Sequence, residues 1–387
     1  MRPLYSLAAA CGTASCLLLS SGRAQPVLPP PGQVLDRMRL ANSWFMRAHP
    51  DPRPDIVTDR ARPSNIWTRG VYYEGLMSLY GIDRDPRYLD YAISWAEAHK
   101  WGLKSGPATR SADDQCCAQT YIELYRLDPK PERISEIKAC VDRMIATPRR
   151  DDWWWIDALQ MAMPVFAKLG ALTGNPDYYA RMHEWFARAR DGGGGKPGLY
   201  NPKEGLWFRD ADFVPPYREP NGRDCFWSRG NGWVMAALAR SMDEMPEGAP
   251  YRDDYVAMLK TMAAAVKAVQ RPDGFWNVSL LDPDHFGGRE TSGTALFTYA
   301  LAWGVGHGLL PRDEYLPVVA RAWNGLATQA EHDDGFLGYV QGTGKQPSDS
   351  QPVGFDKRPN FDDFGLGAFL LAGSAVYALG AGPPAGH

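Results

Sequence analysis

Hydrophobic residues follow two helical patterns that alternate along the chain. In the first pattern nearly every position is apolar or small, as at residues 70–80, 113–125, 154–170, 230–243, 292–306 and 363–379. In the second, apolar residues recur on one face and charged residues cover the other, as at residues 33–47, 86–99, 131–146, 176–190, 251–270 and 313–330. Apolar residues at helical spacing predict α-helices in both cases. We expect the first set to be buried and the second set to cover it.

Short turn sequences separate these helices and resemble one another. Residues 81–86 and 174–177 combine glycine, aspartate or asparagine with proline, which ends one helix and begins the next. The segments RDPRYLDY and GNPDYY are near copies, which indicates an internal repeat. Six helical hairpins that close on themselves form an all-α (α/α)6 barrel, and we predict this fold, with an open helical solenoid as the alternative. In such a barrel the inner helices run in parallel, so their N-terminal ends meet at one mouth.

The N-terminal segment has the features of a secretory signal. Arg2 precedes a short apolar stretch at residues 4–19, and small residues lead to Ala24. We therefore predict a signal peptide over residues 1–24 and one catalytic domain over residues 25–387, exported to the periplasm or the extracellular space. No later apolar run approaches the ~20 residues of a membrane span.

The cysteines leave two questions open. Cys11 or Cys16 would anchor a lipoprotein, which is the alternative to a cleaved signal peptide. Export permits disulfides, and Cys117 and Cys140 could bridge two neighbouring helices. The alternative is that these two cysteines, with Cys116 and Cys225, are buried free thiols.

Composition narrows the class of ligand. The 387 residues carry a net charge of −3, which leaves no electrostatic footprint for nucleic acid. The chain contains 14 Trp, and an indole offers a flat apolar face on which a sugar ring can stack. The histidines lack metal-binding spacing and no nucleotide-binding glycine motif occurs, so we predict neither a metal nor a cofactor.

Asp157 is the strongest catalytic candidate. It follows Trp153, Trp154 and Trp155 at the start of a predicted inner helix, so Asp157 and Trp155 should lie at the mouth. Indoles around a carboxylate exclude water, and desolvation raises the pKa of that carboxylate toward the range of a general acid. The alternative is a carboxylate that only stabilises the helix N-terminus.

A second pair of carboxylates begins another inner helix. Asp113 and Asp114 are adjacent, and only one of them can cap the helix, so the other can point into the mouth. A carboxylate near Asp157 would raise the proton affinity of one member of the pair. We expect Asp114 to face the site, with Asp113 as the alternative.

Arginine and tryptophan residues lie at two further places near the mouth. Arg229 in FWSRGNGW can pair with a substrate carboxylate through two hydrogen bonds, and Trp233 can stack on a sugar; a structural arginine at a helix start is the alternative. Trp207 and Arg209 in GLWFRD should line the mouth, and a surface turn formed by Arg209 and Asp210 is the alternative. Carboxylates, indoles and arginines together predict an acidic oligosaccharide as the substrate.

Two more helix starts contribute candidates. Trp67 and Tyr72, in WTRGVYY, could line the mouth. Thr291 or Ser292 should cap the fifth inner helix, with Glu290 reaching toward the substrate.

Taken in order, six segments resemble glycoside hydrolase family 105, the unsaturated rhamnogalacturonyl hydrolases, and the related family 88 of unsaturated glucuronyl hydrolases. They are WTRGVYYEGLMSLYG, ADDQ, WWWIDALQMAMPVFAKLG, GLWFRD, FWSRGNGWV and ETSGTALFTYALAWG, and the resemblance covers residues 33–380. It implies an (α/α)6 barrel that acts on an oligosaccharide with a 4,5-unsaturated uronic acid at its non-reducing end, left there by a polysaccharide lyase.

The resemblance also implies a mechanism. The aspartate that matches Asp157 protonates C4 of the unsaturated sugar and, as a carboxylate, helps water to add at C5, after which the hemiketal collapses. Other positions that match the family motifs are Asp113 or Asp114, Arg229, Trp233 and Met161. Arg209 stands where many rhamnogalacturonan-type members have a histidine, and Gln160 replaces a phenylalanine. The first departure argues for a glucuronyl end as much as for a galacturonyl end.

Three other functions are compatible with these motifs. An inverting glycosidase on saturated acidic oligosaccharides would use two carboxylates at a defined separation. A polysaccharide lyase of the same fold would create the unsaturated end instead of removing it. A non-catalytic carbohydrate-binding barrel would use the indoles and arginines alone. The sequence predicts neither the next sugar nor the oligomeric state.

Overall fold

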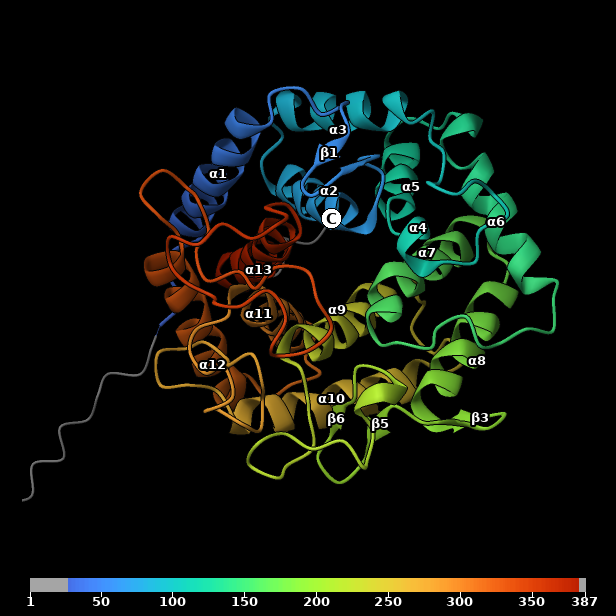
Figure 1. Ribbon diagram of the computed structural model, residues 1–387. Helices are drawn as coiled ribbons and strands as arrows, with labels where there is room; N and C mark the ends of the chain where they lie inside the picture. The colour runs from blue at the N-terminus through green and yellow to red at the C-terminus, as the bar shows by residue number, and fades with distance from the viewer. Residues whose placement is uncertain (1–26, 383–387) are drawn as a thin grey trace, which may run out of the picture.

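The computed structural model describes residues 27–382 and arranges them as two concentric layers of helices (Figure 1). Helices of the inner layer are α2 (Trp67–Ile82), the short α4 (Ala112–Gln115) with α5 (Ala118–Leu127), α7 (Asp157–Thr173), α9 (Ser228–Glu244), α11 (Thr291–Gly306) and α13 (Phe364–Ala381). Helices of the outer layer are α1 (Pro31–Ala48), α3 (Pro86–Ala98), α6 (Ser135–Ile145), α8 (Asp177–Asp191), α10 (Arg252–Ala268) and α12 (Arg312–Gly325). Outer and inner helices alternate along the chain, so the predicted (α/α)6 barrel is confirmed.

The inner layer closes into a ring between its first and last helices. Helix α13 packs against α2 on one side and α11 on the other, which excludes the open solenoid. Closure depends on two glycines: a Cβ at Gly75 would lie 2.5 Å from the carbonyl oxygen of Gly367, and a Cβ at Gly367 would lie 2.1 Å from that of Val71. Only hydrogen side chains permit this approach of the two backbones.

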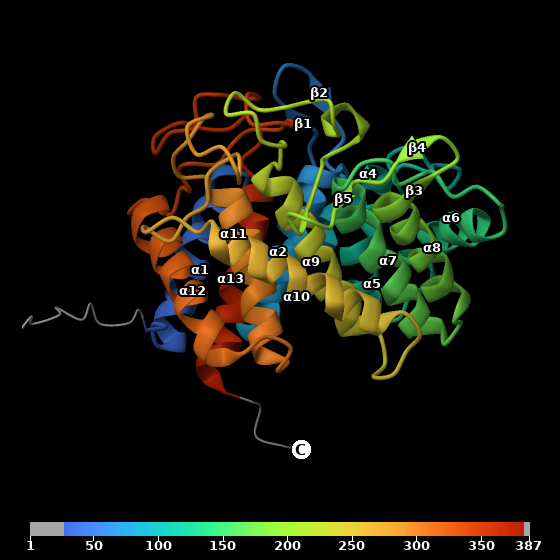
Figure 2. The ribbon, with the colours of Figure 1, turned by 90° about the horizontal axis from the view of Figure 1, so that it is seen from below.

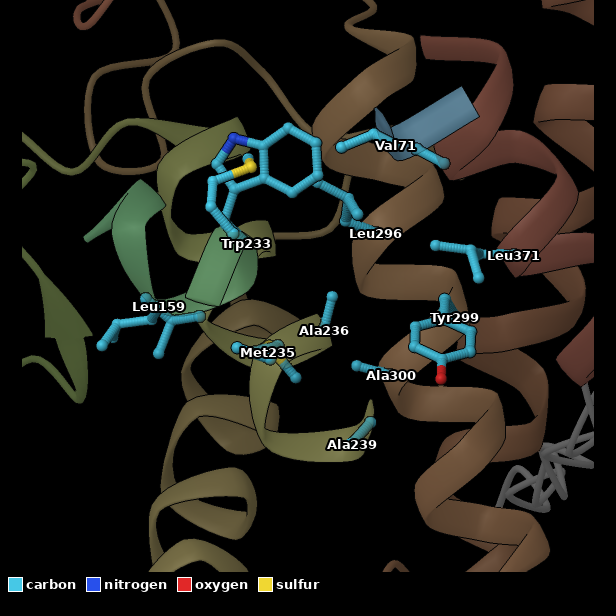
Figure 3. Close-up of a cluster of buried hydrophobic side chains, with 14 of the residues drawn as sticks. Val71, Leu159, Trp233, Met235, Ala236, Ala239, Leu296, Tyr299, Ala300 and Leu371 are labelled. Atoms are coloured by element: carbon cyan, nitrogen blue, oxygen red, sulfur yellow. The ribbon is translucent and has the colours of Figure 1, made fainter. Parts of the chain in front are cut away.

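Side chains from every part of the inner ring fill its axis. Figure 3 shows Val71 of α2, Leu159 of α7, Trp233 of α9, Leu296 of α11 and Leu371 of α13 converging on one cluster, and all are buried. This cluster explains why the inner helices are apolar on nearly all sides. The ring therefore holds its own hydrophobic core.

Helix α13 corrects one sequence expectation. Its 18 residues have a mean hydropathy of 1.7, so it is long and apolar enough to cross a membrane by length and composition. In the structure 67% of this segment is buried inside the protein, as befits a core helix that packs on α1, α2 and α11.

Local chemistry fixes the helix ends. The Asp85 carboxylate accepts a hydrogen bond from the backbone of Arg87 at the start of α3, and Gly174 ends α7 in the left-handed region at φ 69°. Capping of α11 is predicted correctly, but the capping residue is not. The buried Glu290 carboxylate, rather than Thr291 or Ser292, accepts from the first backbone N–H groups, so it does not reach substrate.

The longer segments, which lead from each outer helix to the next inner helix, gather at the end of the barrel where the inner helices begin (Figure 2). They contain three short antiparallel hairpins, β1 (Ile56–Val57) with β2 (Ala61–Arg62), β3 (Gly192–Gly193) with β4 (Lys196–Pro197), and β5 (Tyr200–Asn201) with β6 (Leu206–Trp207). In the first hairpin Ile56 pairs with Arg62 and Val57 with Ala61. Short 3₁₀ helices form η1 (Pro131–Arg133) and η2 (Ala211–Phe213), and a π-helical turn forms η3 (Leu326–Ala330).

Cys116, Cys117, Cys140 and Cys225 are all buried free thiols, so the proposed Cys117–Cys140 bridge is wrong. The Cys117 thiol donates to the carbonyl of Asp114, whereas the Cys140 thiol donates to the carbonyl of Thr109. The predicted signal peptide at residues 1–24, with Cys11 and Cys16, lies outside the described residues. Export and the domain boundary at residue 25 stay predictions.

The glycine contact at the ring closure generates a stability prediction. Gly367→Ala should lower the free energy of unfolding by about 1–3 kcal/mol, because the new methyl group overlaps the backbone of α2. Chemical denaturation measures the change. Gly81→Ala is the matched control, since Gly81 lies in the same pair of helices with open space around it and should be neutral or slightly stabilising. Equal effects of the two substitutions would contradict the proposed tight closure.

Candidate active site

A small pocket opens at the mouth of the barrel, where the inner helices begin. Its walls combine residues from α2, α4, α7 and α9 with residues of three loops, which precede α7, α9 and α13. The lining residues are Trp67, Asp113, Trp155, Asp157, Met161, Arg209, Trp227, Arg229, Trp233 and Gly344. The structure thus brings together most of the side chains that the sequence singled out, from positions up to 166 residues apart, between Trp67 and Trp233.

Asp157 is the first residue of α7 and lies in this pocket with 8% of its surface exposed. Its Oδ2 accepts a hydrogen bond from Arg209 Nε at 2.8 Å. Its Oδ1 has no hydrogen-bond partner among residues 27–382, although it is buried. A buried carboxylate oxygen without a partner is rare in folded proteins, and a ligand hydroxyl or water would satisfy it.

Two opposing effects set the protonation of Asp157. Burial raises the pKa of its carboxyl above the usual value, and this effect dominates. The positive charge and the hydrogen bond of Arg209 oppose the rise, with a smaller contribution from Arg229. The result is a carboxyl that holds its proton more readily than a surface aspartate and can still release it, as a general acid requires.

The backbone places Asp157 and Arg209 side by side. The Ile156 N–H donates to the carbonyl of Arg209 at 3.0 Å, and Trp155 pairs with Asp210 as an isolated antiparallel bridge. The sequence pattern predicted that this helix begins at residue 154. The pairing explains why α7 begins at Asp157 instead. The Arg209 guanidinium lies between two carboxylates, because its Nη1 donates to Asp210 Oδ2 at 2.6 Å. The predicted alternative, a surface turn, does not describe this buried pair.

Asp113, not Asp114, accompanies Asp157 in the pocket. Burial and then the negative charge of Asp157 raise the pKa of Asp113 to about 7. Asp114 lines only a neighbouring cavity, where its Oδ2 accepts from the Thr109 hydroxyl at 2.8 Å and its Oδ1 lies 3.9 Å from Lys104 Nζ. The expectation that Asp114 faces the site is therefore wrong, because two successive helical residues point in different directions and Asp114 faces Thr109.

The run of three tryptophans before Asp157 contributes only one residue to the pocket. Trp155 lines the pocket, but Trp153 packs in the core against Trp185 and Trp154 is 52% exposed. Two other segments supply the remaining indoles: Trp67 begins α2, and Trp227 and Trp233 lie at the start of α9. The water-poor environment is as expected, although its source is a set of distant residues.

Arg229 is buried and holds a loop in place while keeping two donors open. Its Nη1 donates to the carbonyl of Gln341 at 2.6 Å and to the Ser292 hydroxyl at 3.3 Å, and its Nη2 donates to the carbonyl of Gly342 at 2.8 Å. Its Nε–H has no partner among the described residues. Of the five guanidinium donors, the Nε–H and one Nη2–H therefore remain, which are enough for a carboxylate. Burial lowers the pKa of Arg229 to about 10.

Two predicted site residues do not line the pocket. Tyr72 is fully buried in the layer between α1 and α2, where its hydroxyl donates to Asn42 Oδ1 at 2.9 Å. Trp207 is also fully buried, with its ring against Phe186 and Tyr200. Both therefore pack in the core. Motif position alone does not show whether a side chain faces the axis or the outer layer.

Two pocket residues were absent from the predicted set. Trp227 was visible as the aromatic neighbour of Arg229 in FWSRGNGW, so the same motif could have indicated it. Gly344 comes from the loop that precedes α13, and no sequence pattern indicates its place; the hydrogen bonds of Arg229 to residues 341 and 342 put that loop at the pocket.

One group of side chains elsewhere has metal-ligand chemistry. Ligand atoms of Glu219, Asp282 and His285 lie within 4.8 Å of one another. Protein groups already satisfy them: His285 Nδ1 lies 3.1 Å from Glu219 Oε1, and Asp282 Oδ2 accepts from the Asn221 N–H at 3.0 Å. The sequence-based expectation of no metal stays a prediction.

The raised pKa of Asp113 predicts a pH-dependent stability change. A carboxyl whose pKa rises from 3.8 to about 7 on folding destabilises the folded state increasingly as the pH climbs through that interval. Asp113→Asn should therefore change Tm little near pH 3.8 and raise Tm by about 2–4 °C above pH 7. Calorimetry at several pH values measures this difference.

Asp90→Asn provides the control, because Asp90 is exposed on α3 and makes no hydrogen bond or ion pair with the residues from 27 to 382. It should shift Tm by the same small amount at every pH. A gain for Asp113→Asn that is also independent of pH would contradict the assignment of a raised pKa.

Comparison with known proteins identifies the family. The sequence model of Glycosyl Hydrolase Family 88 matches residues 37–379. A protein of Formosa agariphila named unsaturated 3S-rhamnoglycuronyl hydrolase is 35% identical over 334 residues, which are 81% of this chain and 84% of that protein. The structure named glycosyl hydrolase family 88 from Bacteroides vulgatus is 34% identical, with a TM-score of 0.81 over 90% of this chain and 99% of that one.

A further solved structure has a different name. It is described as a polysaccharide lyase, is 37% identical to this chain and has a TM-score of 0.81, covering 90% of this chain and 97% of its own. The family model and the named hydrolases nevertheless agree with each other and with the motifs. The chain belongs to glycosyl hydrolase family 88 and is a glycoside hydrolase that removes unsaturated uronic acid from oligosaccharides.

Proposed function

We propose that this hydrolase removes a 4,5-unsaturated glycuronic acid from the non-reducing end of an acidic oligosaccharide by hydration of the C4=C5 bond, with Asp157 as the acid and base. The observation that carries the proposal is the Asp157 carboxyl itself. One oxygen is held by Arg209, and the other is buried in the pocket without a partner. That free oxygen is where a substrate carbon or a water would exchange a proton.

The reaction needs a proton at one carbon and a hydroxide equivalent at its neighbour. Protonated Asp157 donates its proton to C4, and the electron pair of the C4=C5 bond forms the new C4–H bond. The resulting carboxylate then accepts a proton from the water whose oxygen bonds to C5. The product is a hemiketal at C5, whose ring opens to a C5 ketone and leaves a hemiacetal at C1. Collapse of that hemiacetal releases the next sugar with its hydroxyl restored.

This chemistry requires only one proton-exchanging group. Asp157 returns to its protonated state within one cycle, so a single carboxyl with a raised pKa suffices. Asp113 adds negative charge beside it, which favours the protonated form of one member of the pair. We assign Asp113 to this supporting role and to hydrogen bonding with the sugar.

The remaining pocket residues suit an unsaturated uronate. The open Nε–H and Nη2–H of Arg229 can bind the uronate carboxylate as a pair. The indoles of Trp67, Trp155 and Trp233 offer apolar surface to the flattened sugar ring, and Met161 contributes to the same wall. Arg209 positions Asp157.

The relatives also suggest the next sugar. The Formosa and Alteromonas proteins are both named unsaturated 3S-rhamnoglycuronyl hydrolase, and this chain is 35% and 32% identical to them. We propose a rhamnose-type sugar next to the unsaturated unit here.

The lyase name of one neighbour keeps a second function open to test. A lyase removes the proton at C5 and breaks the C4–O bond to the neighbouring sugar, which leaves as an alcohol, so the C4=C5 bond forms and ultraviolet absorbance of the conjugated product rises. The proposed hydrolase consumes that bond, so absorbance falls. The direction of the change on an intact polysaccharide and on its lyase digest separates the two reactions.

Substitution of the two carboxyls tests the mechanism. Asp157→Asn should lower kcat by about 10²–10⁴-fold, because the amide can neither donate nor accept the required proton. Asp113→Asn should cost less, since it exchanges no proton with the substrate carbons. Loss of absorbance of a lyase-generated disaccharide measures both, with Asp90→Asn as a control for altered surface charge and circular dichroism as a check of folding.

Each other outcome favours a named alternative. Equal abolition at Asp157 and Asp113 would indicate an inverting glycosidase with two catalytic carboxyls. If neither the wild type nor a variant turned over the substrate, and all bound it with the same affinity, the barrel would be a non-catalytic carbohydrate-binding protein.

A further inference from the structure

A second cavity adjoins the pocket of Asp157. Its volume is about 530 Å³, within the range of small-molecule sites. Trp67 and Asp113 line both cavities, so the two spaces meet at these side chains. A sugar bonded to a uronic acid in the smaller pocket would extend past Trp67 into the larger one. We call the larger space the hairpin cavity, because residues 60–63 of the β1–β2 hairpin and its exit form one wall.

The hairpin cavity contains three cations that differ in their partners. Arg62 Nη2 lies 2.7 Å from Asp59, and Lys104 Nζ lies 3.9 Å from Asp114, so each has a counter-charge. The Arg60 guanidinium makes no ion pair or hydrogen bond with any other described residue. Among the described residues, Arg60 is therefore the one cation of this wall whose guanidinium is free to bind a ligand.

The backbone fixes Arg60 at the wall of the cavity. Its carbonyl accepts from the Thr58 N–H at 3.2 Å within the turn, and Arg62 Nη1 donates to the same carbonyl at 3.2 Å. Strand pairing of Val57 with Ala61 encloses this turn. A cation on a tied turn loses less conformational freedom on binding than one on an open loop.

Apolar residues form a large part of the wall, and Thr68, Asp113, Asp114 and Thr343 complete it. Pro63, Ile66 and Phe361 line the cavity beside the indole of Trp67. The Arg62 guanidinium lies over the Phe361 ring at 5.5 Å, which keeps that ring in place. Apolar surface and an unpaired cation in the same cavity suit a sugar with one methyl group and one anionic group.

We propose that the hairpin cavity is the subsite for the sugar next to the unsaturated uronic acid, and that Arg60 binds an anionic substituent, sulfate or carboxylate, on that sugar. The proposal rests on the proposed function, because the terminal unit must occupy the Asp157 pocket. Arg60 is a specificity residue here and not a catalytic one, since it lines only the second cavity. The guanidinium fork matches the oxygen pairs of both groups.

Three disaccharides test the proposal. All carry the same unsaturated uronic acid on rhamnose; one rhamnose is sulfated, one carries a carboxylate substituent and one is neutral. For the wild type we expect a lower KM on at least one charged substrate than on the neutral one. Arg60→Ala should raise KM on that charged substrate about tenfold and leave kcat/KM on the neutral one unchanged. Arg60→Lys should recover part of the loss, because it restores the charge.

Lys260→Ala is the matched control, because Lys260 is an exposed cation on the outer helix α10. It should change no kinetic constant on any of the three substrates. Whichever charged substrate responds to Arg60→Ala distinguishes sulfate from carboxylate.

Other results would overturn the inference in distinguishable ways. If the wild type processes all three substrates and Arg60→Ala changes them equally, Arg60 does not recognise the substituent, while the proposed function stands. If the wild type releases no unsaturated unit from any of them, the proposed function fails and the subsite fails with it.

Discussion

The contact between Arg209 and Asp157 controls the chemistry available at the mouth of this barrel. Without Arg209, burial alone would keep the Asp157 carboxyl protonated, because an unpaired buried charge is costly. With Arg209 at 2.8 Å, one oxygen is fixed and the charged form becomes accessible, while the other oxygen stays free. A group that must give and then take a proton needs this balance. The charge of Arg229 acts in the same direction as that of Arg209, and the charge of Asp157 in turn raises the pKa of Asp113.

The ring determines which groups can share that environment. Inner helices that begin at one end deliver side chains from α2, α4, α7 and α9 to a single pocket, and the glycine contact of α2 with α13 closes the circle. Arg229 then extends the site beyond the helices. Its two terminal nitrogens hold the carbonyls of residues 341 and 342, which brings the loop with Gly344 to the pocket. Arg229 therefore holds this loop in place and also has a free Nε–H at the pocket.

Sequence reasoning predicted the helix pattern and most of the pocket, because periodicity reports burial and the inner helix starts must meet. It failed where the direction of a side chain decides the role. Asp114 and Tyr72 lie in the expected segments but face Thr109 and Asn42, and nothing in local sequence specifies those partners. The run of three tryptophans was misleading in the same way. Only Trp155 lines the pocket, whereas Trp153 packs in the core and Trp154 is exposed, because backbone pairing of Trp155 with Asp210 keeps these residues out of α7. The prediction of a Cys117–Cys140 disulfide failed because the spacing of two cysteines along the sequence does not show where their side chains point.

Titration of the Asp157 carboxyl tests the central claim most directly. Carboxyl carbon resonances of ¹³C-labelled protein, assigned by comparison with Asp157→Asn, report its protonation across the pH range. The account predicts a pKa above the ordinary 3.8, and a further rise when Arg209 is replaced by alanine, because the opposing positive charge is removed. A carboxyl that titrates at or below the ordinary value, and that does not respond to Arg209→Ala, would contradict the account.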